Sequence, residues 1–120
     1  MIEAYRRNLR TFLALCRGND ILPVLSTQTT GSDDPNLQRL VAAMDTFNES
    51  VRDLAAAEDV ALVDCAARMP WDDKIFYDIC HANDGPAGLG RKARVFAQEL
   101  IEARAIEHAW DERSNGEDVR

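Results

Sequence analysis

The 120-residue sequence has few cysteines and no long apolar run, and these absences remove several classes of protein from consideration. Its three cysteines, Cys16, Cys65 and Cys80, are widely spaced and form no C-x-x-C pair. They match neither a disulfide framework nor a cysteine-rich zinc site. No apolar segment approaches the ~20 residues that a membrane span requires, and the first residues, MIEAYRRNLR, lack an apolar signal core. We therefore expect a cytoplasmic protein without a membrane segment.

Basic residues are also scarce, with 14 Lys and Arg against 21 Asp and Glu and a net charge of -7. Proteins that bind nucleic acid need clustered Lys and Arg, and the one basic cluster here, Arg6, Arg7 and Arg10, fits the polar face of a helix. No nucleic-acid partner is expected. Only four Pro and six Gly accompany 46% hydrophobic residues, which favours a folded chain over a disordered one. We expect a single α/β domain over residues 1–110 and a disordered charged tail over residues 111–120.

The spacing of apolar residues predicts three helices and two strands. The expected helices are 3–16, 36–58 and 91–106, and the expected strands are 21–25 and 60–64. Because a helix lies between two apolar strands, the strands should be parallel and joined by a crossover. Pro23 favours the edge of the sheet or the start of its strand. Residues 65–74 are expected to be irregular.

Polar residues follow both predicted strands. Ser26, Thr27 and Gln28 begin the loop after the first strand, and Asp64 ends the second. Open α/β sheets bind ligands at the carboxyl ends of their strands, so these residues and the segment around His81 should lie on one edge. Ser26, Thr27 and Gln28 then form either a wall of a substrate pocket or a solvated loop. We expect Asp64 to accept hydrogen bonds from a neighbouring loop and not to catalyse a reaction.

Asp78 and His81 stand three residues apart in a short aromatic segment before the last helix. One turn of backbone can bring a carboxylate to one imidazole nitrogen while the other nitrogen stays free to accept a proton. Such a pair forms two-thirds of a Ser-His-Asp triad. In the alternative interpretation, Asp78 caps a turn and His81 is a surface loop residue.

Cys80 lies between these two residues and has two interpretations of its own. It is either a nucleophile paired with His81 or a small buried filler, and the filler is favoured because adjacent side chains usually point apart. Asp64, Asp78 and His81 would be adequate ligands for a divalent ion, but their spacing does not demand one. We predict neither a metal nor a cofactor.

Several segments occur in a recognisable order along the chain. They are Tyr5-x-x-Asn8-Leu9, a strand ending near Ser26, Phe47-Asn48-x-x-Val51-Arg52-x-Leu54-Ala55, the strand 60–64, and Phe76-Tyr77-Asp78-x-x-His81-x-Asn83. Over residues 5 to about 100, this order resembles the C-terminal half of the SGNH (GDSL-type) hydrolase family. The resemblance implies a partial flavodoxin-like, three-layer α/β fold with two parallel strands and about three helices. It also implies that Asp78 orients His81 and that His81 is the general base.

The sequence departs from that family at the nucleophile. It has no counterpart of the G-D-S block or of the Gly and Asn blocks of the oxyanion hole, and Pro86 stands where the family usually has Gly, with Gly88 two residues late. None of the serines has the required context; they are Ser26, Ser32, Ser50 and Ser114. We expect an esterase- or lipase-like module that is inactive alone and acts on small-molecule esters only when complemented. The alternative is a truncated, non-catalytic interaction or structural module.

The predicted sheet is too small to cover itself. Parallel sheets are ordinarily buried on all sides, so two parallel strands leave an edge open for pairing. We expect a homodimer, or a partner chain that carries the first half of the fold, to cover that edge.

Overall fold

The structure is a computed structural model, and it describes residues 1–103. The elements are α1 (Ile2–Arg17), β1 (Val24–Ser26), the 3-10 turn η1 (Pro35–Leu37), α2 (Gln38–Ala57), β2 (Ala61–Val63), α3 (Cys65–Arg68) and α4 (Leu89–Glu102). Within these residues there are four α-helices, one more than predicted, and one two-stranded sheet, so the fold is mixed α/β, as predicted. The domain end expected at residue 110, the tail 111–120 and the end of the last helix at 106 lie outside the described residues.

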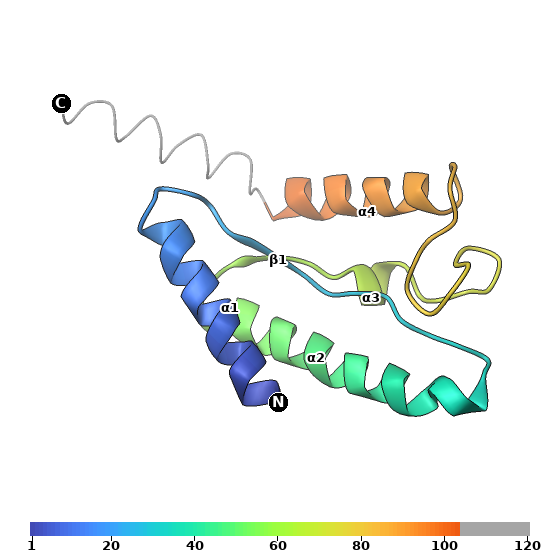
Figure 1. Ribbon diagram of the computed structural model, residues 1–120. Coiled ribbons are helices and arrows are strands. Elements are labelled where there is room, and N and C mark those ends of the chain that lie inside the picture. The colour runs from blue at the N-terminus through green and yellow to red at the C-terminus, as the bar shows by residue number, and fades with distance from the viewer. Residues whose placement is uncertain (104–120) are drawn as a thin grey trace.

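The elements form three layers. Figure 1 shows α4 along one face of the sheet and α1 with α2 along the other. α4 contacts β2, whereas α2 contacts both strands and α1 packs on α2. α1 and α2 match the predicted helices to within two residues at each end, once η1 is counted with α2. The amphipathic pattern was sufficient because each helix has one face that a sheet or another helix covers.

The two strands are parallel, with Leu25 opposite Leu62. β1 begins at Val24, so the strand predicted from residue 21 was placed too early. The chain is still turning at residue 21, because the N–H of Ile21 donates to the carbonyl of Cys16 (2.9 Å). Pro23 directly precedes β1 and has no N–H to offer a ladder. Pro23 therefore lies just before the strand, and β1 is an edge strand among residues 1–103, which agrees with the predicted place of Pro23 at the edge of the sheet.

Two clusters of buried side chains hold the layers together. The first lies between α1, α2 and the sheet and contains Leu13, Leu25, Val51, Leu54 and Ala55. The second contains Met69, Phe76 and Ala82, with Val95 of α4 packed against it. Phe76 and Ala82 flank the segment that carries Asp78 and His81. That segment is therefore anchored in the core at both of its ends.

Two local elements differ from expectation. Residues 65–74 are not irregular throughout, because α3 occupies Cys65–Arg68 and the carboxylate of Asp64 caps it by accepting the N–H of Ala67 (3.3 Å). α4 begins at Leu89, two residues before the predicted start, with Gly88 as its N-cap. A side chain at Gly88 would collide with the carbonyl of Asn83, since an added Cβ would lie 1.9 Å from that oxygen.

One edge of β1 has no neighbouring strand among residues 1–103. Alternate residues of a parallel strand bond to the same neighbour, and the N–H of Thr27 donates to the carbonyl of Val63 (3.1 Å). Leu25 and Thr27 therefore face β2, while the backbone of Val24 and Ser26 faces the open edge. Within the described chain, no helix is long and apolar enough to cross a membrane.

Candidate functional site

A short hairpin positions Asp78 and His81. Phe76 and Ala82 form an antiparallel bridge, and inside it the N–H of Tyr77 donates to the carbonyl of His81 (3.0 Å). The N–H of Asn83 donates to the carbonyl of Ile75 (2.7 Å) and closes the base of the hairpin. The hairpin tip contains the residues between these bonds, so the Asp and the His face each other across one tight turn.

Both carboxylate oxygens of Asp78 are used. Oδ1 accepts the backbone N–H groups of Cys80 (2.8 Å) and His81 (2.7 Å), and Oδ2 lies 2.7 Å from His81 Nδ1. The amide of Cys80, followed by that of His81, holds the pKa of Asp78 down at about 2. An ionised carboxylate can only accept hydrogen bonds, so Nδ1 carries the proton and Nε2 presents its lone pair. No described residue donates to Nε2.

The turn is fixed from outside by three donors. The carbonyls of residues 78, 79 and 80 accept, in order, from Trp71 Nε1 (2.9 Å), the N–H of Gly31 (3.0 Å) and Gln28 Nε2 (3.1 Å). Gly31 and Gln28 belong to the loop after β1, which is the loop predicted to meet this segment. Carbonyls held in this way leave the turn little freedom to rotate the carboxylate away from the imidazole.

A pocket of about 260 Å³ lies beside the pair, and its lining includes Gln28, Tyr77, Cys80, His81 and Lys92. The ring of Tyr77 stacks on that of His81 with centroids 5.7 Å apart. The His81 and Asp78 side chains are 63% and 41% exposed, so a ligand or a second protein can reach them. No serine or threonine of the described chain lines this pocket.

The three residues predicted as a pocket wall separate in the structure. Gln28 does line the pocket, as expected. Thr27 is buried and serves the scaffold, because its hydroxyl donates to Asp64 (2.7 Å) and accepts the N–H of Ala66 (3.0 Å). Ser26 is exposed on the outer edge of β1, does not line the pocket, and turns its hydroxyl to the carbonyl of Thr27 (3.0 Å). Thr27 and Ser26 therefore do not line this pocket, and the exposed Ser26 fits the alternative of a solvated loop.

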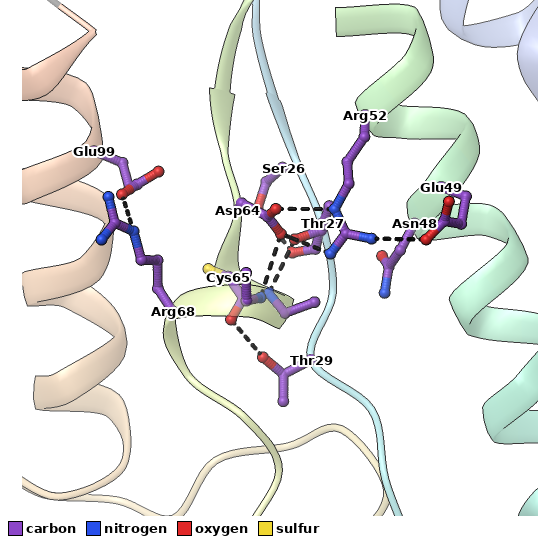
Figure 2. A network of polar contacts seen from close by, with 12 residues as sticks. Ser26, Thr27, Thr29, Asn48, Glu49, Arg52, Asp64, Cys65, Arg68 and Glu99 are labelled. Atoms are coloured by element: carbon purple, nitrogen blue, oxygen red, sulfur yellow. Dashed lines mark hydrogen bonds and ion pairs between the residues drawn. The ribbon is translucent and has the colours of Figure 1, made fainter.

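Asp64 accepts hydrogen bonds from a neighbouring loop, as predicted, and also from a helix. Figure 2 shows Arg52 of α2 reaching across to it, with Nε 2.9 Å from Oδ2 and Nη2 2.9 Å from Oδ1. The hydrogen bonds from Arg52 are the main reason that the pKa of Asp64 is lowered. This bidentate ion pair joins α2 to the end of β2. Through the hydrogen bond from Thr27, Asp64 also holds the loop that supports the hairpin.

Asn48 holds the same loop from the other side. Its side-chain amide accepts the N–H of Gln28 (2.9 Å) and donates to the carbonyl of Gln28 (2.8 Å). These are the two bonds that a neighbouring strand would make, so Asn48 takes the place of a strand at that residue. Sequence reasoning assigned no role to Asn48 or Arg52, although both stand in one of the segments that carried the family resemblance. Trp71 and Gly31 lie in none of those segments, so no sequence pattern pointed to them.

Cys80 is not the buried filler that was expected. It is partly exposed, and its Sγ lies 3.5 Å from His81 Nδ1, because the tight turn directs these adjacent side chains toward each other. Burial, followed by the charge of Asp78, raises the pKa of the thiol. The thiol is therefore protonated at neutral pH, which disfavours a Cys80 nucleophile.

The possible metal ligands that lie together in the structure differ from the three considered in the sequence, which were Asp64, Asp78 and His81. Among residues 1–103, the cluster of possible ligands consists of Asp78, Cys80 and His81, whose ligand atoms all lie within 4.8 Å of one another. Asp64 does not belong to it, since both of its carboxylate oxygens bind Arg52.

Of the four serines of the sequence, Ser114 lies outside the described residues.

A scan against protein-family models, a search of curated proteins and a search of solved structures each found no match for this chain.

Proposed function

We propose that this chain is a hydrolase module of SGNH type with a partial flavodoxin-like fold, in which His81 is the general base and Asp78 orients it. The observation that carries the proposal is the 2.7 Å contact between Asp78 Oδ2 and His81 Nδ1 beside an open pocket. The order of segments that resembles this family supports the same assignment. The substrates would be small-molecule esters.

The chemistry needs a serine hydroxyl, and no serine of the described chain lines the pocket. A serine from another segment or chain would donate its proton to Nε2 of His81 as its oxygen attacks the ester carbonyl. Asp78 would stabilise the imidazolium that forms. The imidazolium would then protonate the departing alcohol, and water activated by the same nitrogen would release the acid.

The sheet supports the idea of a completing partner. β1 has an unpaired edge among the described residues, and several large apolar side chains of the helices are exposed. Among them are Phe12 (47%) and Leu15 (62%) of α1 and Ile101 (67%) of α4. A strand from a second copy, or from a chain carrying the first half of the fold, would pair with this edge and cover such residues.

A non-catalytic interaction or structural module is the second candidate. The absence of a serine or threonine from the pocket lining of the described chain favours it. In that case Asp78 would act only as the cap of its turn, and the open strand edge would be the functional feature.

Hydrolysis of p-nitrophenyl acetate by residues 1–120 separates the two candidates. Without a serine in the pocket lining of the described residues, the chain alone should release p-nitrophenol only slowly, through attack by His81 or by water that His81 activates. General-base catalysis contributes about a hundredfold or more, so His81→Ala should remove nearly all of the rate above buffer. Asp78→Asn should lower the rate, whereas Asp84→Asn, which changes the acid that lines the pocket, should not. Equal background rates in all four proteins would exclude catalysis by the chain alone and favour the non-catalytic module.

A further inference from the structure

The tip of the hairpin brings together three different metal-binding side chains. The Asp78 carboxylate, the Cys80 thiol and the His81 imidazole lie within 4.8 Å of one another. We propose that Asp78 Oδ2, Cys80 Sγ and His81 Nδ1 bind one zinc ion, with water as the fourth ligand. This site does not depend on the hydrolase assignment, because it requires only these three residues.

Two of the ligand atoms already have the separation that zinc requires. With Zn–S of about 2.3 Å and Zn–N of about 2.0 Å, a tetrahedral centre places sulfur and nitrogen about 3.5 Å apart. Cys80 Sγ and His81 Nδ1 lie 3.5 Å apart. Asp78 Oδ2, at 2.7 Å from Nδ1, must retreat by about 0.6 Å to reach tetrahedral spacing. A small rotation of the carboxylate about Oδ1, which stays bonded to the two amides, would supply this movement without displacing the turn.

The surroundings hold the three ligands in place without occupying them. Asp78 Oδ1 stays bonded to the amides of Cys80 and His81 and thereby keeps Oδ2 directed toward the imidazole. The carbonyls of all three turn residues from 78 to 80 are held by donors from two other segments. Hydrogen bonds of this kind around the ligands commonly improve metal affinity by about 10–100-fold.

The donor set selects the metal. One thiolate, one imidazole and one carboxylate suit zinc, whereas magnesium and calcium prefer oxygen ligands alone. The pocket is open, so solvent can supply the fourth ligand. Lys92 lines the same pocket, and its positive charge opposes a cation, so Lys92→Ala should tighten zinc binding.

Binding would change the protonation of two ligands. The Cys80 thiol would release its proton to solvent as the thiolate binds zinc. The proton on His81 Nδ1 would be lost from that nitrogen, and Nε2 would carry a proton in its place. A zinc-loaded His81 would therefore be unable to act as a base, and zinc would inhibit any reaction that uses it.

Cobalt and zinc titrations of the reduced, metal-free chain test this site directly. We expect one Co²⁺ per chain, with thiolate-to-cobalt charge-transfer absorption that Zn²⁺ abolishes and Mg²⁺ does not. Cys80→Ser should remove that absorption, and both Cys80→Ser and His81→Ala should weaken zinc binding at least tenfold by calorimetry. Cys16→Ser changes a thiol outside the cluster and should leave both signals unchanged.

Circular dichroism of each variant would establish that it is folded. Asp78→Asn provides a third loss-of-ligand variant and, like Cys80→Ser, hardly changes the shape of the side chain. The proposal is overturned if the charge-transfer absorption survives in Cys80→Ser, or if zinc binds wild type and all three ligand variants equally. The other histidine of the sequence is His108, which lies outside the described residues. The proposal is also overturned if zinc affinity falls in His108→Ala and not in Cys80→Ser, because the ion would then bind elsewhere.

Discussion

The two carboxylate oxygens of Asp78 have different roles, one structural and one chemical. Oδ1 closes the turn through two backbone amides, and Oδ2 meets the imidazole of His81. The two interpretations of this residue, turn cap and orienter, are therefore compatible. The cap makes the orientation possible, because the same hydrogen bonds that close the turn keep the carboxylate ionised and fixed.

The ionisation of Asp78 has a measurable pH dependence. Its pKa is lowered from 3.8 to about 2 in the folded chain, chiefly by the amides of Cys80 and His81. Because the folded value lies below the ordinary one, the ionised carboxylate stabilises the turn above pH 3.8, and this contribution is lost as the pH falls through about 2. Carboxyl ¹³C NMR should give a midpoint near 2 in the native chain and near 3.8 in urea. A native midpoint near 3.8 would contradict the hydrogen-bonding pattern.

Asn48 offers a second test at the level of one residue. It is buried, and its side chain pairs with both backbone groups of Gln28. Asn48→Ala would leave those groups without partners, and we expect the free energy of unfolding to fall by about 1–3 kcal/mol. Urea denaturation would measure the change. The exposed Asn8→Ala serves as the matched control and should shift stability by no more than about 0.5 kcal/mol; an equal loss in both variants would remove the special role of Asn48.

The hairpin depends on close contact between two loops. Gly31 donates its N–H to the carbonyl of residue 79, and an added Cβ would lie 2.5 Å from Cβ and Cγ of Trp71. This leaves no room for a side chain. Trp71, in turn, donates to the carbonyl of Asp78, so displacement of its ring would loosen the turn.

Gly31→Ala should therefore disturb the hairpin more than the helices. We expect overpacking to cost about 1–3 kcal/mol of unfolding free energy and to increase amide exchange at Cys80 and His81. Gly18→Ala is a suitable control, because Gly18 has an ordinary helical φ of -70° and its added Cβ would lie no nearer than 3.3 Å to a neighbouring atom. Unchanged stability and exchange in Gly31→Ala would show that Trp71 does not hold the turn.

Sequence patterns predicted the regular elements better than their connections. The apolar stripe of α1 and the β-α-β order follow from local periodicity and chain geometry, and both are confirmed. The start of β1 was misplaced because the cap of α1 continues to Ile21 and Pro23 follows soon after. α3 escaped notice because it is one turn long and depends on a single capping carboxylate.

The candidate site was predictable to a similar degree. The contact between Asp78 and His81 could be predicted from their spacing, because a single turn of the backbone determines it. The approach of Cys80 to His81 depends on how that turn directs two adjacent side chains, and the support from Trp71 and Gly31 comes from other segments. Neither follows from local spacing. Of the two alternatives for Ser26 and Thr27, a pocket wall or a solvated loop, the wall does not fit this pocket, because the hydroxyl of Thr27 donates to Asp64 and Ser26 does not line it.

For the whole molecule, the open edge of β1 is the most consequential feature. In the described chain, the sheet has two strands, and the backbone of Val24 and Ser26 faces away from β2. Helices cover both faces of this small sheet, as Figure 1 shows, but they do not replace a third strand. Among residues 1–103, a side chain satisfies these outward backbone groups only at Gln28, where Asn48 binds both of them.

We expect the chain to associate through this edge. Light scattering should show a dimer, and Ser26→Pro should weaken the association, because it removes an N–H that points to the open edge while leaving the bonds of Leu25 and Thr27 to β2. Ser26→Ala keeps that N–H and should associate like the wild type. A monodisperse monomer that unfolds cooperatively in dilute solution, or equal association in all three proteins, would contradict edge pairing.

The central claim is that Asp78 fixes the tautomer of His81 and leaves Nε2 free to accept a proton. ¹⁵N NMR of the imidazole at alkaline pH tests this claim most directly, because it distinguishes the protonated ring nitrogen from the bare one. We expect the proton on Nδ1 in the wild type, and a shift of the population toward the Nε2-protonated form in Asp78→Asn. A wild-type ring protonated mainly on Nε2, or an identical spectrum in the variant, would contradict the assignment of Asp78 and His81 as orienter and base.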